Sequence, residues 1–234
     1  MAGILSAFRA MWKERGWAVT LMYVAHRILQ GVSRGHGGVF PYVLVAQPIG
    51  RGSYAQVRDD ARTVVRVVDA DDPVTASFPR PAAINRQRWA AGATCYAAES
   101  GGELAGTIWI QRTRYLEDEV CCEYRLADPA VSAWDFDVYV VPRLRLGRTM
   151  GRLWKAVDAD LAARGVQWSF SRISLFNAAS ISSHARLGAV SVGRVVFVRI
   201  GRAQVAFLGR WPGVHASLGR RPPVIVLAPP APAR

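Results

Sequence analysis

The sequence predicts an α/β fold, with a mixed and mostly antiparallel sheet flanked by helices and a helical extension at the N-terminus. Short Val-rich runs recur between Gly, Pro and Asp residues, a pattern typical of strands. The stretch 134–193 reads as strand, basic turn, helix, strand and helix. With 234 residues, 51% of them hydrophobic, the chain can bury a sizeable core.

Residues 1 to about 32 are predicted to be helical, because apolar residues recur at helical spacing on both sides of Gly16. A basic amphipathic helix of this kind either lies on a membrane surface or packs on the domain that follows. We expect packing and keep peripheral membrane contact as the alternative. A glycine-dense segment at 35–38 then breaks the helix, so residues 1–36 form the extension. The apolar positions are Ile4, Leu5, Phe8, Met11, Trp12, Leu21, Val24, Ile28 and Leu29.

The next part of the chain alternates strands with one short helix. Val-rich runs at 39–49 and 63–69 read as strands, and 84–91 reads as a short helix. The runs 93–99 and 104–112 are separated by a turn that contains Gly101 and Gly102, which is a hairpin signal. The sheet domain is expected to span residues 37–215.

The strand at 134–141 carries two carboxylates. Strict alternation would put Trp134 and Phe136 on one face and Asp135 and Asp137 on the other. Burying two unpaired carboxylates is costly. They are therefore expected either to bond Arg side chains such as Arg172 or to line a cleft.

A basic turn at 143–151 follows this strand and leads into a helix at 152–164, which Gly165 ends. A helix N-terminus attracts anions, because its backbone N–H groups lack partners and its dipole is positive there. A strand at 166–174 comes next. Asn177 then caps a helix that ends at Gly188.

Two other segments have simpler readings. Glu117, Asp118 and Glu119 form an acidic cluster, either a solvated loop tip or the rim of a cleft that attracts an amine. Residues 216–234 are rich in proline and are predicted to be a disordered tail.

The net charge is +13, but the basic residues are Arg apart from Lys13 and Lys155 and are spread along the chain. Nucleic-acid binding would need clustering on one face, so it is not predicted. Three cysteines, two of them adjacent, show neither a disulfide framework nor metal-ligand spacing. With no cleavable signal and no run of about 20 apolar residues, the default location is cytoplasmic.

The order of elements in 134–193 resembles the cofactor-binding half of the GNAT acyltransferase superfamily, enzymes that move an acyl group from coenzyme A to an amine. The resemblance rests on Val140-Val141-Pro142 running into the Arg-rich turn, and on Asn177-Ala-Ala-Ser180 followed by His184 and Gly188. The family turn carries two glycine positions. Aligned from Pro142, Arg148 and Met150 occupy them here, and Arg145 and Arg148 would compensate by contacting phosphate directly.

The resemblance implies an N-acetyltransferase that uses acetyl-CoA or another acyl-CoA, needs no metal, and acts on a small-molecule or peptide amine. Asp135 or Asp137 would be the general base. His184 stands where the family often has a Tyr that protonates the departing thiolate. Two alternatives stay open, a non-catalytic binding module and a membrane-associated acyltransferase that uses acyl carrier protein. The implied cofactor-binding residues are Val140, Val141, Arg145, Gly147, Arg148, Gly151, Asn177 and Ser180.

Overall fold

The computed structural model describes residues 2–52, 54, 56–117, 119–145, 147–209, 213–219 and 221–231, with side chains in the N-terminal helix described at Trp12 and from Gly16 onward. Its helices are α1 (Ala2–Val32), α2 (Ala82–Ala90), α3 (Thr149–Ala163) and α4 (Ala178–Arg186). Its strands are β1 (Gly37–Pro48), β2 (Thr63–Val68), β3 (Thr94–Ser100), β4 (Glu103–Gln111), β5 (Arg114–Leu116), β6 (Glu123–Leu126), β7 (Ser132–Val140), β8 (Trp168–Ser174), β9 (Val190–Ile200), β10 (Ala203–Leu208), β11 (Val214–Ser217) and β12 (Val224–Leu227).

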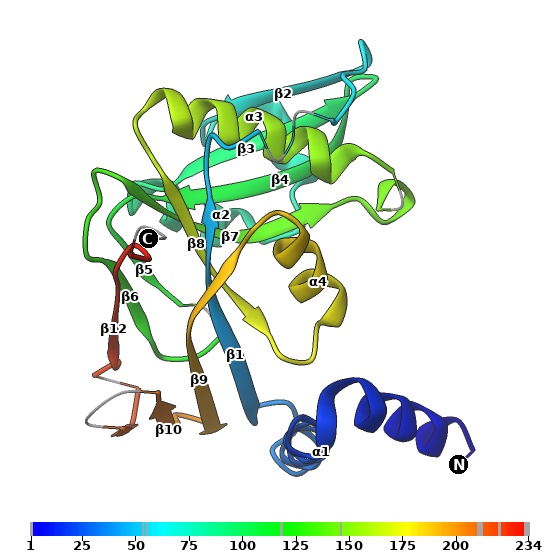
Figure 1. Ribbon diagram of the computed structural model, residues 1–234, viewed down its shortest axis with the longest axis vertical. Coiled ribbons are helices and arrows are strands. Elements are labelled where there is room, and N and C mark those ends of the chain that lie inside the picture. Colours follow the sequence, from blue (N-terminus) through cyan, green and yellow to red (C-terminus); the bar gives the residue numbers. More distant parts are fainter. Residues whose placement is uncertain are drawn as a thin grey trace.

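The predicted fold class is confirmed. Nine strands form one sheet in the order β11-β10-β9-β1-β8-β7-β4-β3-β2, and β12-β6-β5 form a second, smaller sheet. All strand pairs are antiparallel except β7–β8 and β12–β6. Figure 1 shows β1, the first strand of the chain, in the middle of the molecule, and its neighbours in the sheet are β8 and β9.

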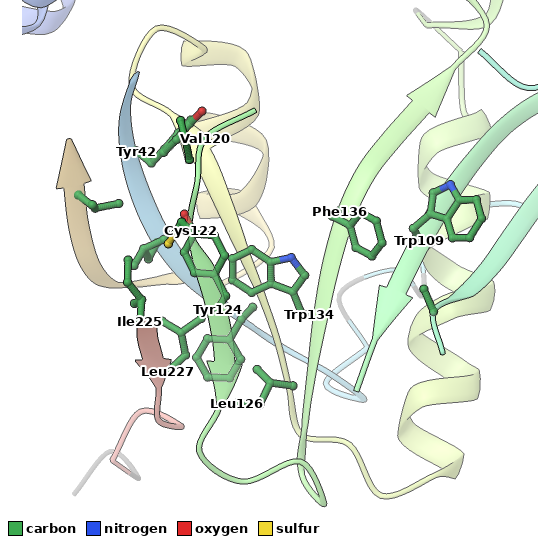
Figure 2. Close-up of a cluster of buried hydrophobic side chains, with 14 of the residues drawn as sticks. Tyr42, Trp109, Val120, Cys122, Tyr124, Leu126, Trp134, Phe136, Ile225 and Leu227 are labelled. Carbon is green, nitrogen blue, oxygen red and sulfur yellow. The ribbon is translucent and has the colours of Figure 1, made fainter. Parts of the chain in front are cut away.

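Each face of the large sheet is covered by a separate apolar cluster. On one face, side chains of β5, β6 and β12 pack against Trp109, Trp134 and Phe136 (Figure 2). On the other face, Leu153, Trp154 and other residues of α3 pack against β3 and β4. The two faces therefore present different environments to residues of the central strands.

The second half of α1 packs on the sheet domain, as the favoured reading expected. Gly16 interrupts the helix with a φ of 78°. Beyond it, the Tyr23 ring meets Phe176 edge-on at 5.3 Å between centroids. The Nδ1 atom of His26 lies 2.8 Å from the Val39 carbonyl oxygen. The residues that anchor the extension are therefore in its second half.

The prediction of a disordered tail over 216–234 is wrong for Val224–Leu227. These residues form β12, which pairs in parallel with β6. Ile225 and Leu227 are buried beside Tyr124 (Figure 2). The prolines flank the Val-Ile-Val-Leu run instead of interrupting it, so its N–H groups remain available to the ladder.

We predict that Leu227→Ala lowers the free energy of unfolding by about 2–4 kcal/mol, because a buried Leu loses its contacts and leaves a cavity. Val226→Ala is the matched control, since Val226 is 44% exposed. It should cost less than about 0.5 kcal/mol. Urea denaturation measures both. Equal midpoints for the two variants would show that the strand does not contribute to the core.

Candidate functional site

The candidate site lies where β7 and β8 separate. The two strands run in parallel but pair only from Ser132–Trp168 to Trp134–Phe170. Beyond that point β7 continues to Val140 and β8 to Ser174, and the strands run apart (Figure 1). Backbone groups that β8 no longer engages can pair with an extended ligand, as in strand addition.

A β-bulge interrupts β7 at Asp137. Thr107 of β4 faces Tyr139, but Trp109 faces Phe136, so β7 has one extra residue. Asp137 has a φ of 49°, a left-handed conformation that is uncommon for residues other than glycine. A bulge breaks the alternation of side chains. Val138 accordingly packs in the cluster on the α3 face, opposite the cluster that contains Phe136.

The bulge separates the two predicted carboxylates, and the prediction that they share a face is wrong. Asp135 accepts a hydrogen bond from Ser169, whereas Asp137 is paired with Arg80 and Arg88. The expected partner Arg172 bonds neither of them and pairs with Glu117 and Glu119. Sequence periodicity assumes an unbroken strand, so it missed this result.

Asp137 is held by two guanidinium groups. Arg88 Nη1 lies 2.5 Å from its Oδ2 atom, and Arg80 Nη2 lies 3.2 Å from Oδ1. Burial alone would raise the pKa of Asp137. The hydrogen bonds and charges of Arg80 and Arg88 outweigh burial and hold that pKa below its usual range. Asp137 is therefore a carboxylate at neutral pH and a weak base.

Asp135 belongs to a buried polar cluster on the opposite face, formed by Gln47, Tyr54, Asp135, Ser169 and His184. Ser169 Oγ donates to Asp135 Oδ2 at 2.7 Å. Burial raises the pKa of Asp135 to about 7, against the opposing effect of the Ser169 hydrogen bond. A carboxyl with a pKa near neutrality can exchange protons at physiological pH.

His184 is oriented by a residue that sequence reasoning missed. Gln47 Nε2 donates to the Tyr54 hydroxyl at 2.6 Å, so its Oε1 atom faces His184 Nδ1 at 2.8 Å. A glutamine oxygen only accepts, which puts the proton on Nδ1 and leaves Nε2 as an acceptor. Burial lowers the pKa of His184, so the neutral ring is favoured. His184 also lines an apolar pocket of about 670 Å³ between α4, β1 and β9.

The predicted phosphate turn stands at the end of β7. Arg145 Nε donates to the Val140 carbonyl oxygen at 3.1 Å, and the Val141 N–H donates to Ala105 at 2.9 Å. The Val141 N–H is therefore engaged within the sheet. Gly147 leads to Arg148, which stands at the N-cap of α3 without a side-chain capping bond. The first turn of a helix leaves N–H groups for an anion.

Gly151 has a packing role within this turn. A Cβ atom added at Gly151 would lie 3.1 Å from a Val57 methyl group. The glycine therefore allows α3 to approach the segment around Val57. This contact explains a glycine that the family resemblance would assign to the cofactor.

The second predicted group stands at the end of β8. Asn177 Oδ1 accepts the Ser180 N–H at 3.0 Å, so the predicted N-cap of α4 is confirmed. Gly188 follows the helix with a φ of 81°, as a helix stop requires. The two groups of predicted cofactor residues thus follow the two strands that separate, with α3 after β7 and α4 after β8.

A polar pocket of about 370 Å³ opens at the divergence and is lined by residues of both strands. The acidic cluster belongs to it: Arg172 Nη2 lies 2.7 Å from Glu117 Oε1 and 3.1 Å from Glu119 Oε2. This supports the cleft-rim reading of the cluster, although Asp118 lies outside the described residues. The polar pocket is lined by Arg80, Arg88, Tyr115, Glu117, Glu119, Asp135, Phe136, Asp137 and Arg172.

Two kinds of feature were searched for in the part of the chain that the structure describes. No helix there is long and apolar enough to cross a membrane. Within the same residues, His, Cys, Asp and Glu side chains form no group of three that could hold a metal ion.

Comparison with known proteins finds similarity in structure only, since no family model and no curated protein matches the sequence. The structure is similar to a GNAT-family protein from Novosphingobium aromaticivorans, with 20% identity and a TM-score of 0.48 over 68% of this chain and 63% of that one. A tandem GNAT protein from the clavulanic acid biosynthesis pathway has 16% identity and a TM-score of 0.48, over 71% of this chain and 56% of that one.

A third similar structure is an aminoglycoside acetyltransferase from an uncultured soil metagenomic sample, in complex with sisomicin. It has 9% identity and a TM-score of 0.39, over 55% of this chain and 88% of that one. The chain spans 63% or less of the first two structures. Likeness at this level does not establish activity.

We predict that Asp135→Asn removes a pH-dependent loss of stability. The folded-state pKa of Asp135 is about 7, above the value of about 3.9 in an unfolded chain. The protonated form stabilises the fold below pH 4, and this contribution is lost as the pH rises through 7. Relative to the variant, the native chain should therefore lose a few kcal/mol between pH 4 and 8.

Urea denaturation of both chains at pH 5 and pH 8 measures this difference. Asn carries no proton at either pH, so the variant is the reference for the single carboxyl. A difference between the two chains that stays constant across this range would show that Asp135 does not titrate in the folded protein.

Proposed function

We propose that this chain is an acyl-CoA-dependent N-acyltransferase in which an amine attacks the thioester directly. The observation that carries the proposal is the divergence of two parallel strands, with a helix N-terminus beyond the end of each and a polar pocket between them. Strand edges suit a ligand that has amide groups along an extended arm, and a helix N-terminus suits its phosphates. Coenzyme A has both.

The residues present fit that ligand with one difference from the family pattern. Arg145 and Arg148 stand at the start of α3 and are exposed. They would bind phosphate oxygens through their guanidinium groups in place of a glycine-rich loop. When bound, acyl-CoA supplies an activated acyl group. Beyond Trp134, β7 offers its backbone edge to the arm that carries this group.

Asp135 is the better candidate for the general base. Its pKa of about 7 allows it to take a proton from an ammonium-like intermediate at neutral pH. Asp137 has a depressed pKa and two Arg partners, which makes it a weak base. In the overall reaction the C–N bond forms, the C–S bond breaks, the amine gives up a proton and the thiolate takes one up.

His184 remains the candidate for the second proton transfer. Because Nε2 of the neutral ring holds a lone pair, His184 would first accept a proton there and then donate it to the thiolate. Gln47 acts as a positioning residue, since it fixes the tautomer through Nδ1.

We predict that the chain binds acetyl-CoA and that Arg145→Ala and Arg148→Ala each weaken binding. The effect should be larger in low salt, where phosphate contacts are less screened. Arg164→Ala is the matched control, because Arg164 follows the opposite end of α3 and is 53% exposed. Calorimetric titration measures the dissociation constants. Absence of binding to the native chain would favour the non-catalytic module, and turnover only with acyl carrier protein would favour the third reading.

We predict that Asp135→Asn lowers kcat by about 10²-fold or more in an assay of thiol release, because the variant lacks the general base. With the native chain, the rate should rise with pH and level off above an apparent pKa near 7. The variant should lose this step in the profile. If the variant keeps the step, another group provides the base.

A further inference from the structure

We propose that the acceptor is a zwitterion, namely an amino acid or another small molecule that carries a carboxylate close to its reactive amine. This inference rests on the proposed function and concerns the polar pocket. It follows from the way in which charged side chains are shared at the two ends of that pocket.

One end of the pocket has an excess of positive charge. Arg80 and Arg88 share the single carboxylate of Asp137. Arg88 is 7% exposed and lies over the rings of Trp109 and Phe136, at 5.3 and 5.2 Å from their centroids. This packing fixes its guanidinium, whereas the side chain of Arg80 is 52% exposed at the mouth. Two guanidinium groups and one carboxylate leave one positive charge in excess.

The other end has an excess of negative charge. Glu117 and Glu119 share the single guanidinium of Arg172. The Glu117 side chain is 1% exposed, and the Arg172 guanidinium lies over the Tyr42 ring at 4.3 Å. Glu119 accepts a hydrogen bond from the Tyr42 hydroxyl at 2.6 Å, and half of its side chain is exposed. One negative charge is therefore in excess there.

A ligand with one charge of each sign complements both ends at once. An amine without a carboxylate would meet uncompensated positive charge at Arg80 and Arg88. A carboxylate without an amine would meet uncompensated negative charge at Glu119. Such mismatches select against the wrong partner as much as the matches favour the right one. The small volume of about 370 Å³ suits a molecule of amino-acid size.

The orientation of this ligand agrees with the proposed chemistry. The negative end includes Arg172 of β8, one of the two strands between which acyl-CoA is proposed to lie. The ammonium group would therefore bind near the divergence, and the carboxylate would bind towards α2, which carries Arg88. Tyr115 and Phe136 form aromatic walls of the same pocket.

The test compares matched acceptors at a saturating concentration of acetyl-CoA. The probes are the twenty common amino acids, their carboxamides, and simple alkyl amines. We expect the best amino acid to exceed its own carboxamide in kcat/KM by about tenfold or more, because the carboxamide lacks the charge that pairs with Arg80 and Arg88. In Arg80→Ala this ratio should fall towards one.

Arg125→Ala is the control variant. Its side chain is 53% exposed and pairs with Glu123, so it resembles Arg80 in exposure and in having a carboxylate partner but does not line the pocket. The control should keep the ratio of the native chain. Equal losses for the amino acid and the carboxamide in Arg80→Ala, or a native preference for the uncharged acceptors, would overturn the proposal.

A binding arm separates this inference from the proposed function. Calorimetric titration with the same amino acid and carboxamide needs no turnover, and the amino acid should bind more tightly in the native chain but not in Arg80→Ala. Acylation of carboxamides or alkyl amines in preference to amino acids leaves the proposed function standing and rejects the zwitterion. Selective binding without acylation of any probe supports the zwitterion and rejects the proposed function.

Discussion

The bulge at Asp137 is the constraint on which the site depends. One extra residue in β7 turns the strand over, so that carboxylates two positions apart reach opposite faces of the sheet. It lies just beyond Trp134, where the ladder to β8 ends. A single local irregularity therefore marks the place where the sheet opens and also distributes the charged groups around that opening.

The two faces give these carboxyl groups opposite acidities. Asp135 is surrounded by neutral partners, and burial raises its pKa. Asp137 has two cationic partners that outweigh the effect of burial on its pKa. Environments that push a pair of similar groups apart in pKa are a general means of giving them different tasks. Here one group is suited to proton transfer and the other to holding cations in place.

Much of the fold could be predicted from local sequence, because strands, the hairpin at Gly101 and Gly102, and the Asn177 cap depend on near neighbours. The site itself could not. Gln47, Tyr54 and Ser169 meet Asp135 and His184 only through pairing across the sheet, and no spacing in the chain signals this. The bulge depends on the match between β7 and β4, and the order in β12 depends on β6. Proline content described the tail correctly as irregular around this strand but not within it.

The central position of β1 has a consequence for how the chain reaches its structure. Tyr42 of β1 pairs with Ser174 on one side and Val195 on the other, so both neighbours of this strand are synthesised long after it. Closing such long loops costs entropy before any contact is gained, and topologies of this kind fold slowly. An almost wholly apolar strand must therefore wait on the ribosome without its partners. During that interval the nascent chain is exposed to misassociation and depends on protection by chaperones.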